Sequence, residues 1–510
     1  MRFGVTLILY LSIFTLSLAK NISLYDYGLI GAKSGEERFW VLYNAHADAL
    51  KKNYTLDYSG IRSLDIEIPA NAKSIPVSNR TDFQGMSLQV TNNKKKDFCL
   101  FVLENQAKEI KVAKRYFSSL DFSDYPELRK GTVLLVVHDD TPWVKNRIGF
   151  NYGAMRYDIL LLNNGRSENN PISSYYNEVS IPRCSFVLVT TKKKYFRNIN
   201  FYRTPSSTQK TFLLRVKYQN NIELNDIKLF TPKNEILYGD HIISLDHCTN
   251  VSLKRILVDN TYSKKDKFGY AFSLNNVWNT KVSEILATAP WGVFVNSNVN
   301  KAVISKCNIN RFDLHCYGRD YYFDKCVISS GIPIGSFLGT MSFKKCTFRG
   351  SLPCYYRYDY NSYHPFNLEF DHCTIEMDNN YHCFMYYSQL SNDENSRPEL
   401  RRKSLPNITI KDCDVMLSSG LTSFDIIYMG NNYYQSSLSG INYIKIKGLN
   451  VTGVCDELRI ITNSTKTESP VTVSIRGLKT KGTRSPQLKV NLKDGQGHPA
   501  HLILNDTLKR

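Results

Sequence analysis

The side chains best suited to chemistry in this sequence gather in residues 311–320. Because a β-strand turns successive side chains to opposite faces, one face of this run is small and apolar: Phe312, Leu314, Cys316 and Gly318. The other face carries Arg311, Asp313, His315, Tyr317 and Arg319, with Asp320 at its end. Guanidinium, carboxylate, imidazole and phenol groups in one row can bind an anion and transfer protons. The row predicts a functional site, although a solvated or salt-bridged strand face has the same composition.

The charge of the chain indicates what such a row would bind. Lys and Arg number 65 against 46 Asp and Glu, which gives a formal net charge of +19, and the basic runs are spread along the chain. Excess positive charge attracts polyanions such as acidic polysaccharides and nucleic acids. No nucleic-acid-binding motif occurs, so we expect an anionic polysaccharide as the partner and no nucleic acid.

One reaction that the row suits is β-elimination from a uronic acid residue. His315 or Tyr317 would act as the acid or base. Arg311 or Arg319 would bind the substrate carboxylate, because a guanidinium matches a carboxylate bidentately. The excess of positive charge favours this reaction.

The alternative reaction is glycoside hydrolysis, in which two carboxyl groups do the acid and base work. Asp313 would supply one of them. The second would be Asp320, Asp240 or Asp359.

A repeat that begins at residue 196 provides the scaffold for this strand. Each unit reads apolar, two polar or Gly residues, then Ile, Cys or Leu, as in Phe196-Arg-Asn-Ile199. The eleven anchors of the pattern stand at positions 199, 227, 256, 285, 307, 326, 346, 373, 413, 449 and 478. The shortest spacings, about 20 residues, match one turn of a β-solenoid, and loops inserted into a coil explain the longer ones.

Cysteines occupy five successive anchors, at positions 307, 326, 346, 373 and 413. Stacked side chains on neighbouring coils run parallel to each other, which suits disulfide geometry poorly. We therefore expect buried, reduced thiols. No Cys/His spacing resembles a zinc site and no acidic cluster is dense enough for calcium, so we expect no metal and no cofactor.

The N-terminal region is expected to contain a signal peptide and a helix that caps this solenoid. The basic start, the apolar run to residue 18 and the small residues before position 20 predict a signal peptide over 1–19, and hence a secreted protein, extracellular or periplasmic. That run is too short for a membrane span, and no later one is long enough. Residues 36–52 have helical composition, and a helix there would cap the open edge of the first coil. We expect a capping region with the first strands over 20–195, the β-helix over 196–480 and a strand-like tail over 481–510.

Small residues flank the charged row on the neighbouring coils, and a shallow groove along the solenoid axis follows. Gly292 precedes the row, and Gly331 and Gly335 follow it. Further substrate-binding candidates fall on the same side, namely Asp240, Tyr355 and Arg357. His247 and the pair Asp371-His372 are interpreted as turn residues.

The repeat, together with Asp26-Tyr27-Gly28 before a helix, resembles the right-handed parallel β-helix proteins of the pectate-lyase-like superfamily. The Arg-x-Asp-x-His strand between 291–296 and 331–335 is similar to that of a narrower group of bacterial and phage-tail β-helix proteins. The resemblance covers roughly residues 20–480. It implies an all-β, right-handed parallel β-helix that acts on extracellular polysaccharides as a lyase or a hydrolase. A non-catalytic adhesin or glycan-binding fibre is the alternative. The oligomeric state stays open.

Overall fold

The computed structural model describes residues 20–144, 154–170, 183–230, 242–259, 270–287, 292–335, 337–350, 352–356, 366–378, 383–387, 405–418, 423–429, 441–453, 456–462, 465–467, 469–481, 487–494 and 496–505. The signal peptide expected over 1–19 lies outside these ranges and stays a prediction. No helix of the described part is long and apolar enough to cross a membrane.

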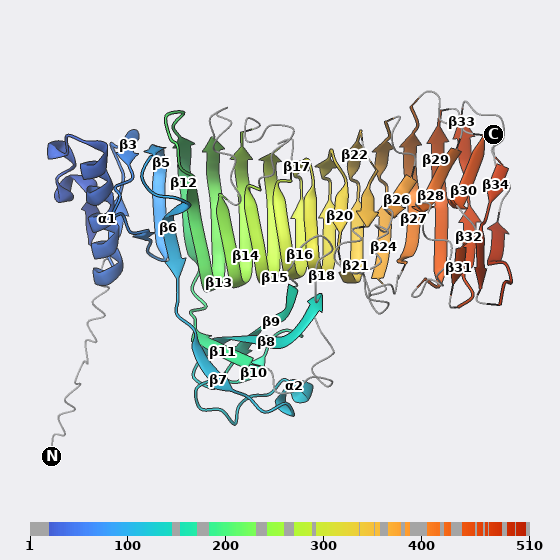
Figure 1. Ribbon diagram of the computed structural model, residues 1–510, viewed down its shortest axis with the longest axis horizontal. Coiled ribbons are helices and arrows are strands. Elements are labelled where there is room, and N and C mark those ends of the chain that lie inside the picture. Colours follow the sequence, from blue (N-terminus) through green and yellow to red (C-terminus); the bar gives the residue numbers. More distant parts are fainter. Residues whose placement is uncertain are drawn as a thin grey trace, which may run out of the picture.

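Parallel strands stacked along one axis form an elongated solenoid (Figure 1). Its strands are β3 (Ser63–Glu67), β4 (Ile75–Pro76), β5 (Arg80–Thr91), β6 (Phe98–Glu104), β12 (Lys194–Arg203), β13 (Thr211–Phe230), β14 (Ile243–Val258), β15 (Phe272–Ala287), β16 (Phe294–Ser305), β17 (Asn308–Ile309), β18 (Phe312–Asp324), β19 (Val327–Ile328), β20 (Ile332–Ile334), β21 (Phe337–Lys344), β22 (Thr347–Arg349), β23 (Cys354–Tyr356), β24 (Phe366–Asp371), β25 (Thr374–Glu376), β26 (Cys383–Tyr387), β27 (Asn407–Met416), β28 (Ser423–Met429), β29 (Tyr443–Thr452), β30 (Glu457–Ile461), β32 (Thr472–Arg476), β33 (Lys479–Lys481), β34 (Gln487–Lys489) and β36 (His501–Asn505). The all-β parallel β-helix predicted from the repeat is confirmed. Its parallel pairing extends beyond residues 196–480 at both ends, to β3 and to β36.

The eleven anchors stack in one register from coil to coil. Ile199 pairs with Ile227, and the same alignment continues through the cysteine anchors to Leu449 and the strand after Leu478. The residue before every anchor adopts a left-handed conformation, with φ between 49° and 70°. Five of these corner residues are Gly, Asn or Asp, which tolerate that conformation best, and the other six are Arg, Glu, Lys or His.

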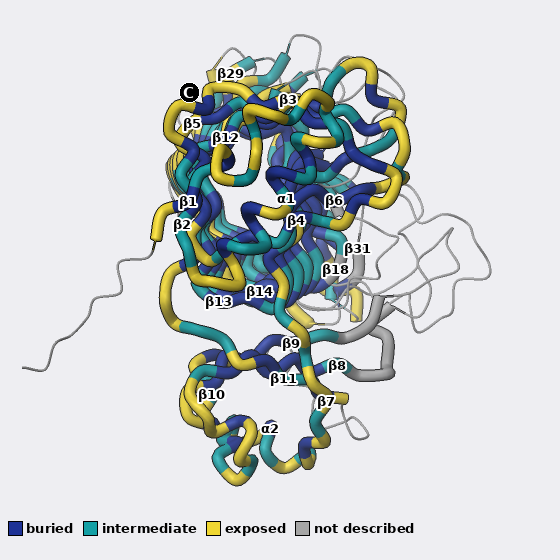
Figure 2. Tube along the Cα trace, turned by 90° about the vertical axis from the view of Figure 1, so that its left-hand side faces the viewer, coloured by how far each residue is buried: buried dark blue, intermediate teal, exposed yellow. Residues whose placement is uncertain are grey.

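Helix α1 (Gly35–Lys52) closes the N-terminal opening of the solenoid, as Figures 1 and 2 show. Ser34 and Glu37 form a capping box at its start. Its buried face, which includes Phe39 and Leu42, packs into the same core as the first coils. The capping helix expected over 36–52 is therefore confirmed. Beside it, η1 (Leu24–Tyr27) and η2 (Leu29–Gly31) follow β1 (Asn21–Ser23), which pairs with β2 (Thr55–Asp57).

The cysteine anchors are buried inside the solenoid, and the ten cysteines whose side chains the structure describes are free thiols. The predicted reduced ladder of Cys307, Cys326 and Cys346 is thus confirmed. Burial raises the pKa of the neighbouring core thiol Cys248 to about 12, which keeps it protonated.

An antiparallel sheet is inserted between β6 and β12 and lies beside the solenoid (Figures 1 and 2). The strands of this sheet are β7 (Lys108–Lys111), β8 (Thr132–Val144), β9 (Ala154–Asn163), β10 (Arg166–Ser167) and β11 (Arg183–Leu188), and the short helix α2 (Tyr116–Ser119) lies between β7 and β8 in the chain. One apolar face of this sheet, with Val136 and Ile159, packs near Tyr218 and Trp278 of the solenoid. The sequence predicts strands within residues 131–165 but does not predict which strands pair with each other.

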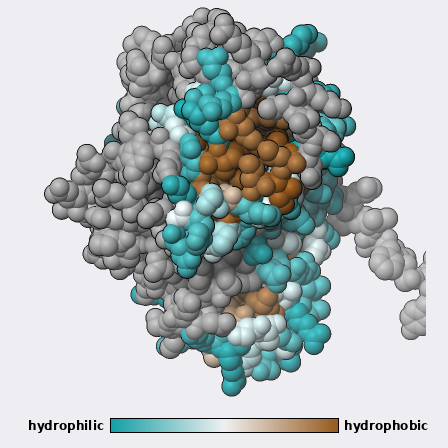
Figure 3. Space-filling model, turned by 90° about the vertical axis from the view of Figure 1, so that its right-hand side faces the viewer, coloured by the Kyte–Doolittle hydropathy of each residue, from teal (hydrophilic) through white to brown (hydrophobic). Residues whose placement is uncertain are grey.

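At the C-terminal end of the solenoid, the last core-facing side chains are those of Leu502 and Leu504, which are 41% and 57% exposed. Figure 3 views this end and shows an apolar area surrounded by hydrophilic residues. Next to it, β31 (Thr465–Thr467) pairs with β35 (Leu492–Asp494).

Candidate functional site

Strand β18 contains one more residue than the coils on either side of it. Leu314 and Gly318 enclose three residues, whereas their pairing partners enclose two: Asn296 and Val299 before, Ile334 and Phe337 after. The extra residue forms a β-bulge at His315, a feature that commonly re-aims a side chain beside an active site.

Gly335 of the next coil makes room for this bulge. A Cβ at Gly335 would stand 2.8 Å from the carbonyl carbon of His315 and closer still to its oxygen. The Gly335 N–H donates to the carbonyl of Leu314 at 2.8 Å. The glycine predicted as a groove floor therefore has a steric reason, which is the close approach of two backbones.

Asp313 lies at the centre of the site and is fully buried. Its Oδ2 accepts hydrogen bonds from Arg311 Nη2 at 2.6 Å and from the Tyr270 hydroxyl at 2.8 Å. Burial acts to raise the pKa of Asp313. The interactions with His315, Arg311 and Tyr270 outweigh burial and hold that pKa below its usual value. Asp313 is therefore an ionised acceptor that fixes the groups around it.

The hydroxyl of Tyr270 joins the carboxylate to the imidazole. It lies 3.2 Å from His315 Nε2, whereas that nitrogen is 3.9 Å from Asp313 Oδ2. The two rings meet edge to face, with centroids 5.9 Å apart. The His315 side chain is 17% exposed, so the imidazole stands at the rim of the buried network.

The sequence reasoning missed Tyr270, which lies two residues before the start of β15, two coils before β18. Gly292, between the two coils, gives it space. A Cβ there would lie 2.5 Å from Tyr270 Cε1 and 3.3 Å from Arg311 Nε. The only sequence signal was Gly292 itself, noted as a small residue beside the row.

Arg311 is held at the same centre. Besides Asp313 it contacts the hydroxyl of Tyr355 at 3.3 Å, and its side chain is 12% exposed. Burial acts to lower the pKa of Arg311, but Asp313 and the two tyrosines raise it overall, so the guanidinium stays charged. The structure thus joins Arg311, Asp313, His315 and Tyr355 of the predicted residues, and adds Tyr270.

The predicted single row does not continue to Asp320. Tyr317 adopts a left-handed corner conformation (φ 44°) and is buried, so the chain turns to another face there. Beyond that corner, Arg319 pairs with Asp320 at 3.4 Å, and Asp320 accepts a hydrogen bond from the Thr340 N–H. The strict alternation assumed for this strand is wrong because the bulge and the corner each break the period of two. Asp240, Arg357 and Asp359 lie outside the described residues.

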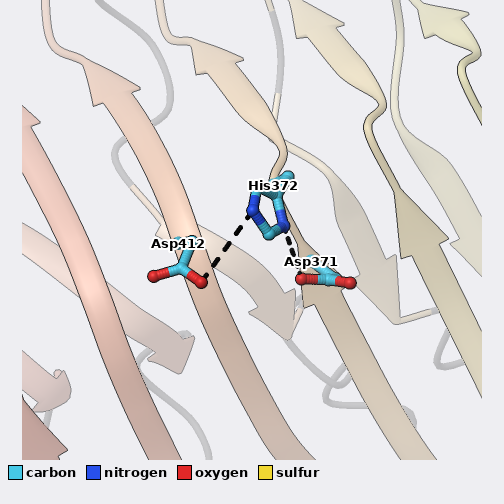
Figure 4. A group of neighbouring side chains, drawn as sticks. All are labelled: Asp371, His372 and Asp412. Carbon is cyan, nitrogen blue, oxygen red and sulfur yellow. Dashed lines mark hydrogen bonds and ion pairs between the residues drawn. The ribbon is translucent and has the colours of Figure 1, made fainter.

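A separate cluster, Asp371, His372 and Asp412, lies on later coils (Figure 4). His372 Nδ1 is 2.7 Å from Asp371, and its Nε2 is 3.9 Å from Asp412. His372 and Asp412 are successive corner residues, so the stack follows from the repeat, as expected of a turn pair. The ammonium of Lys411 lies 3.1 Å from Asp371 and supplies a cation already.

Comparison with known proteins identifies similar folds only. No family model and no curated protein match the chain. Three solved tailspikes cover most of it. The Gp54 tailspike of Acinetobacter baumannii bacteriophage AP22, solved in complex with A. baumannii capsular saccharide, is 13% identical with a TM-score of 0.46, over 94% of this chain and 77% of that one. Gp49 of Pseudomonas phage LKA1 is 10% identical with a TM-score of 0.42, over 91% and 83%. Gp61 of Pseudomonas phage phi297 is 11% identical with a TM-score of 0.38, over 96% and 81%. At these values the likeness says nothing about the ligand or reaction of the present chain.

Proposed function

We propose that the protein is an exported β-helix protein that binds an acidic polysaccharide at the His315 bulge and cleaves it by β-elimination. The observation that carries this proposal is the Tyr270 hydroxyl, which lies within hydrogen-bond distance of both Asp313 and His315. A phenol, a carboxylate and an imidazole in one network are the groups that proton transfer requires. The net charge of +19 would attract an anionic polymer.

The hydrogen-bond roles in this network assign the base. The ionised Asp313 only accepts, so the Tyr270 hydroxyl donates to it. The phenol oxygen then accepts from His315 Nε2–H. In a neutral imidazole this leaves Nδ1 unprotonated, which makes Nδ1 the general base.

In the proposed step, His315 Nδ1 removes the proton from the carbon beside the substrate carboxylate. The electrons of that C–H bond form a C=C bond as the glycosidic C–O bond breaks. The imidazolium then gives its proton to the departing oxygen and returns to its starting state. The charged Arg311, whose side chain is 12% exposed, would attract the substrate carboxylate, and Asp313 is a positioning residue.

Hydrolysis fits the site less well. It requires two carboxyl groups on opposite sides of the scissile bond, one of them protonated. Of the carboxylates predicted for it, Asp313 is buried and ionised, and Asp320 lies beyond the corner with Arg319. The described part of the site therefore offers no pair.

A non-catalytic glycan-binding protein is the second candidate. The observation that favours it is the closure of the network, because Asp313 is fully buried and Arg311 is 12% exposed. Such an ion pair would shape a binding surface without reacting.

Kinetics on variants test the proposal. The full chain is incubated with polygalacturonate, alginate, hyaluronan and dextran, and unsaturated products and new reducing ends are both measured. For a substrate that is cleaved, we expect His315→Ala and Tyr270→Phe to lower the rate by about 10²–10⁴. The matched controls His498→Ala and Tyr322→Phe, at residues exposed by 69% and 42%, should retain the rate. Equal rates in all four variants would place the reaction elsewhere.

A further inference from the structure

A crevice of about 570 Å³ lies between the inserted sheet and the solenoid. The inserted sheet contributes His138 and Tyr157, and the solenoid contributes four successive coils, which carry Lys217, Asp246, Asn275 and Ser297 at equivalent positions. Adjacent parallel strands lie about 4.8 Å apart, so this solenoid wall is roughly 14 Å long.

The crevice opens beside the candidate site. Ser297, at its last coil, pairs in register with Cys316, the residue after His315. A chain lying along the solenoid axis at the bulge would therefore enter the crevice one coil away.

The polar groups of the crevice are suited to hydroxyl groups. Asn298 is 7% exposed and lines it; its Nδ2 donates to Asn276 Oδ1 at 3.0 Å. Among the described residues its own Oδ1 has no hydrogen-bond partner. A buried acceptor of this kind costs free energy unless a donor reaches it, and a sugar hydroxyl is such a donor.

Charge and ring placement point the same way. His247 Nδ1 lies 2.7 Å from Asp246, whose other oxygen is 3.7 Å from Lys217, so the carboxylate of Asp246 balances the ammonium of Lys217. The ring of Tyr157 meets His247 edge to face, with centroids 5.8 Å apart, and forms an aromatic wall. A balanced, aromatic and hydrogen-bonding surface favours neutral, hydroxyl-rich sugar residues over the charged group held at Arg311.

We propose that this crevice is a second saccharide subsite, which binds neutral sugar residues of the polysaccharide whose acidic residue lies at the His315 bulge. The inference rests on the proposed function and extends it. It makes the protein selective for longer polymers, because only a chain that spans both places gains both sets of contacts.

Binding as a function of oligosaccharide length tests the subsite. Hyaluronan oligomers, which alternate acidic and neutral sugars, are titrated calorimetrically into the full chain from dimer to decamer, with oligogalacturonates and oligoalginates in parallel. We expect the affinity to rise with length and Tyr157→Ala to weaken binding of the longest oligomers about 10-fold while dimer binding is unchanged. Asn298→Gly, which keeps the left-handed corner, should have the same selective effect. The exposed Tyr322→Ala is the control.

The other outcomes of these titrations would refute either the second subsite or the proposed function. If Tyr157→Ala and Asn298→Gly bind long oligomers as the wild type does, or lose short and long ones equally, the second subsite is refuted. Arg311→Lys distinguishes this from the first site, because it removes the guanidinium that attracts the acidic residue and should weaken dimers and decamers alike. If no oligomer of the three series binds the wild type, the proposed function fails and the subsite fails with it.

Discussion

Gly335→Ala tests the link between the solenoid and the candidate site. The substitution adds one methyl group beside the His315 bulge, where a Cβ would lie 2.8 Å from the His315 carbonyl carbon and 3.0 Å from the Leu314 oxygen. Carbon atoms in ordinary contact are about 3.5–4.0 Å apart, so one backbone must move by about 1 Å. Both neighbours are backbone atoms that cannot rotate away.

The cost follows from two terms. Overpacking of a tight site costs about 1–3 kcal/mol. The movement also stretches the hydrogen bond from the Gly335 N–H to Leu314, which contributes about 0.5–1.5 kcal/mol. We therefore expect a loss of about 2–4 kcal/mol in the free energy of unfolding, together with displacement of His315 from Tyr270.

Guanidinium chloride unfolding measures the first effect and glycan titration the second. Gly31→Ala is the matched control, because Gly31 has an ordinary φ and no atom would lie within 4 Å of its Cβ. The control should change stability by less than about 0.5 kcal/mol. If Gly335→Ala unfolds and binds glycan as the wild type does, the bulge does not depend on this glycine.

The remaining predictions concern buried groups. Asp313→Ala leaves Arg311 buried without its carboxylate and should cost about 3–5 kcal/mol in a denaturant titration, unlike Asp412→Ala at an exposed corner. The pKa of Asp313 is lower in the folded protein than in the unfolded chain. Its contribution to the free energy of unfolding should therefore be present above about pH 3.8 and be lost as the pH falls through the lower folded-state pKa, as acid unfolding would measure. Burial lowers the pKa of His46 to about 3. Its contribution to the free energy of unfolding should therefore be complete above about pH 6.5 and decline by about 5 kcal/mol toward pH 3. His46→Phe should flatten that pH dependence. Ellman's reagent should label Cys248, located by peptide mapping, only after denaturation, and rapid labelling of Cys248 in the native protein would contradict its burial.

The repeat was predictable from sequence because one coil imposes one pattern. The anchors must face the core, which restricts them to Ile, Cys or Leu, and the left-handed corner before each anchor carries a polar residue or Gly on every coil. The capping helix was predictable for the same kind of reason, since Ser34 and Glu37 signal its start locally.

The site was only partly predictable, because its geometry depends on relations between coils. A single inserted residue at His315 is invisible to an alternating pattern, yet it separates Asp313 from Arg319 and Asp320. Tyr270 reaches the site across two coils, which local composition cannot indicate. The antiparallel sheet was read as strands without partners, because its pairing joins β8 to β11 across a long stretch of chain.

The most direct test of the central claim is mass spectrometry of the products formed in water labelled with oxygen-18. The full chain is incubated with the acidic polysaccharides, and the new chain ends are analysed. Elimination at the His315–Tyr270 network predicts unsaturated ends that carry no label, because no water enters the cleaved bond. One labelled oxygen at each new reducing end would show hydrolysis, and binding without cleavage would show a glycan-binding protein; either result would contradict the account.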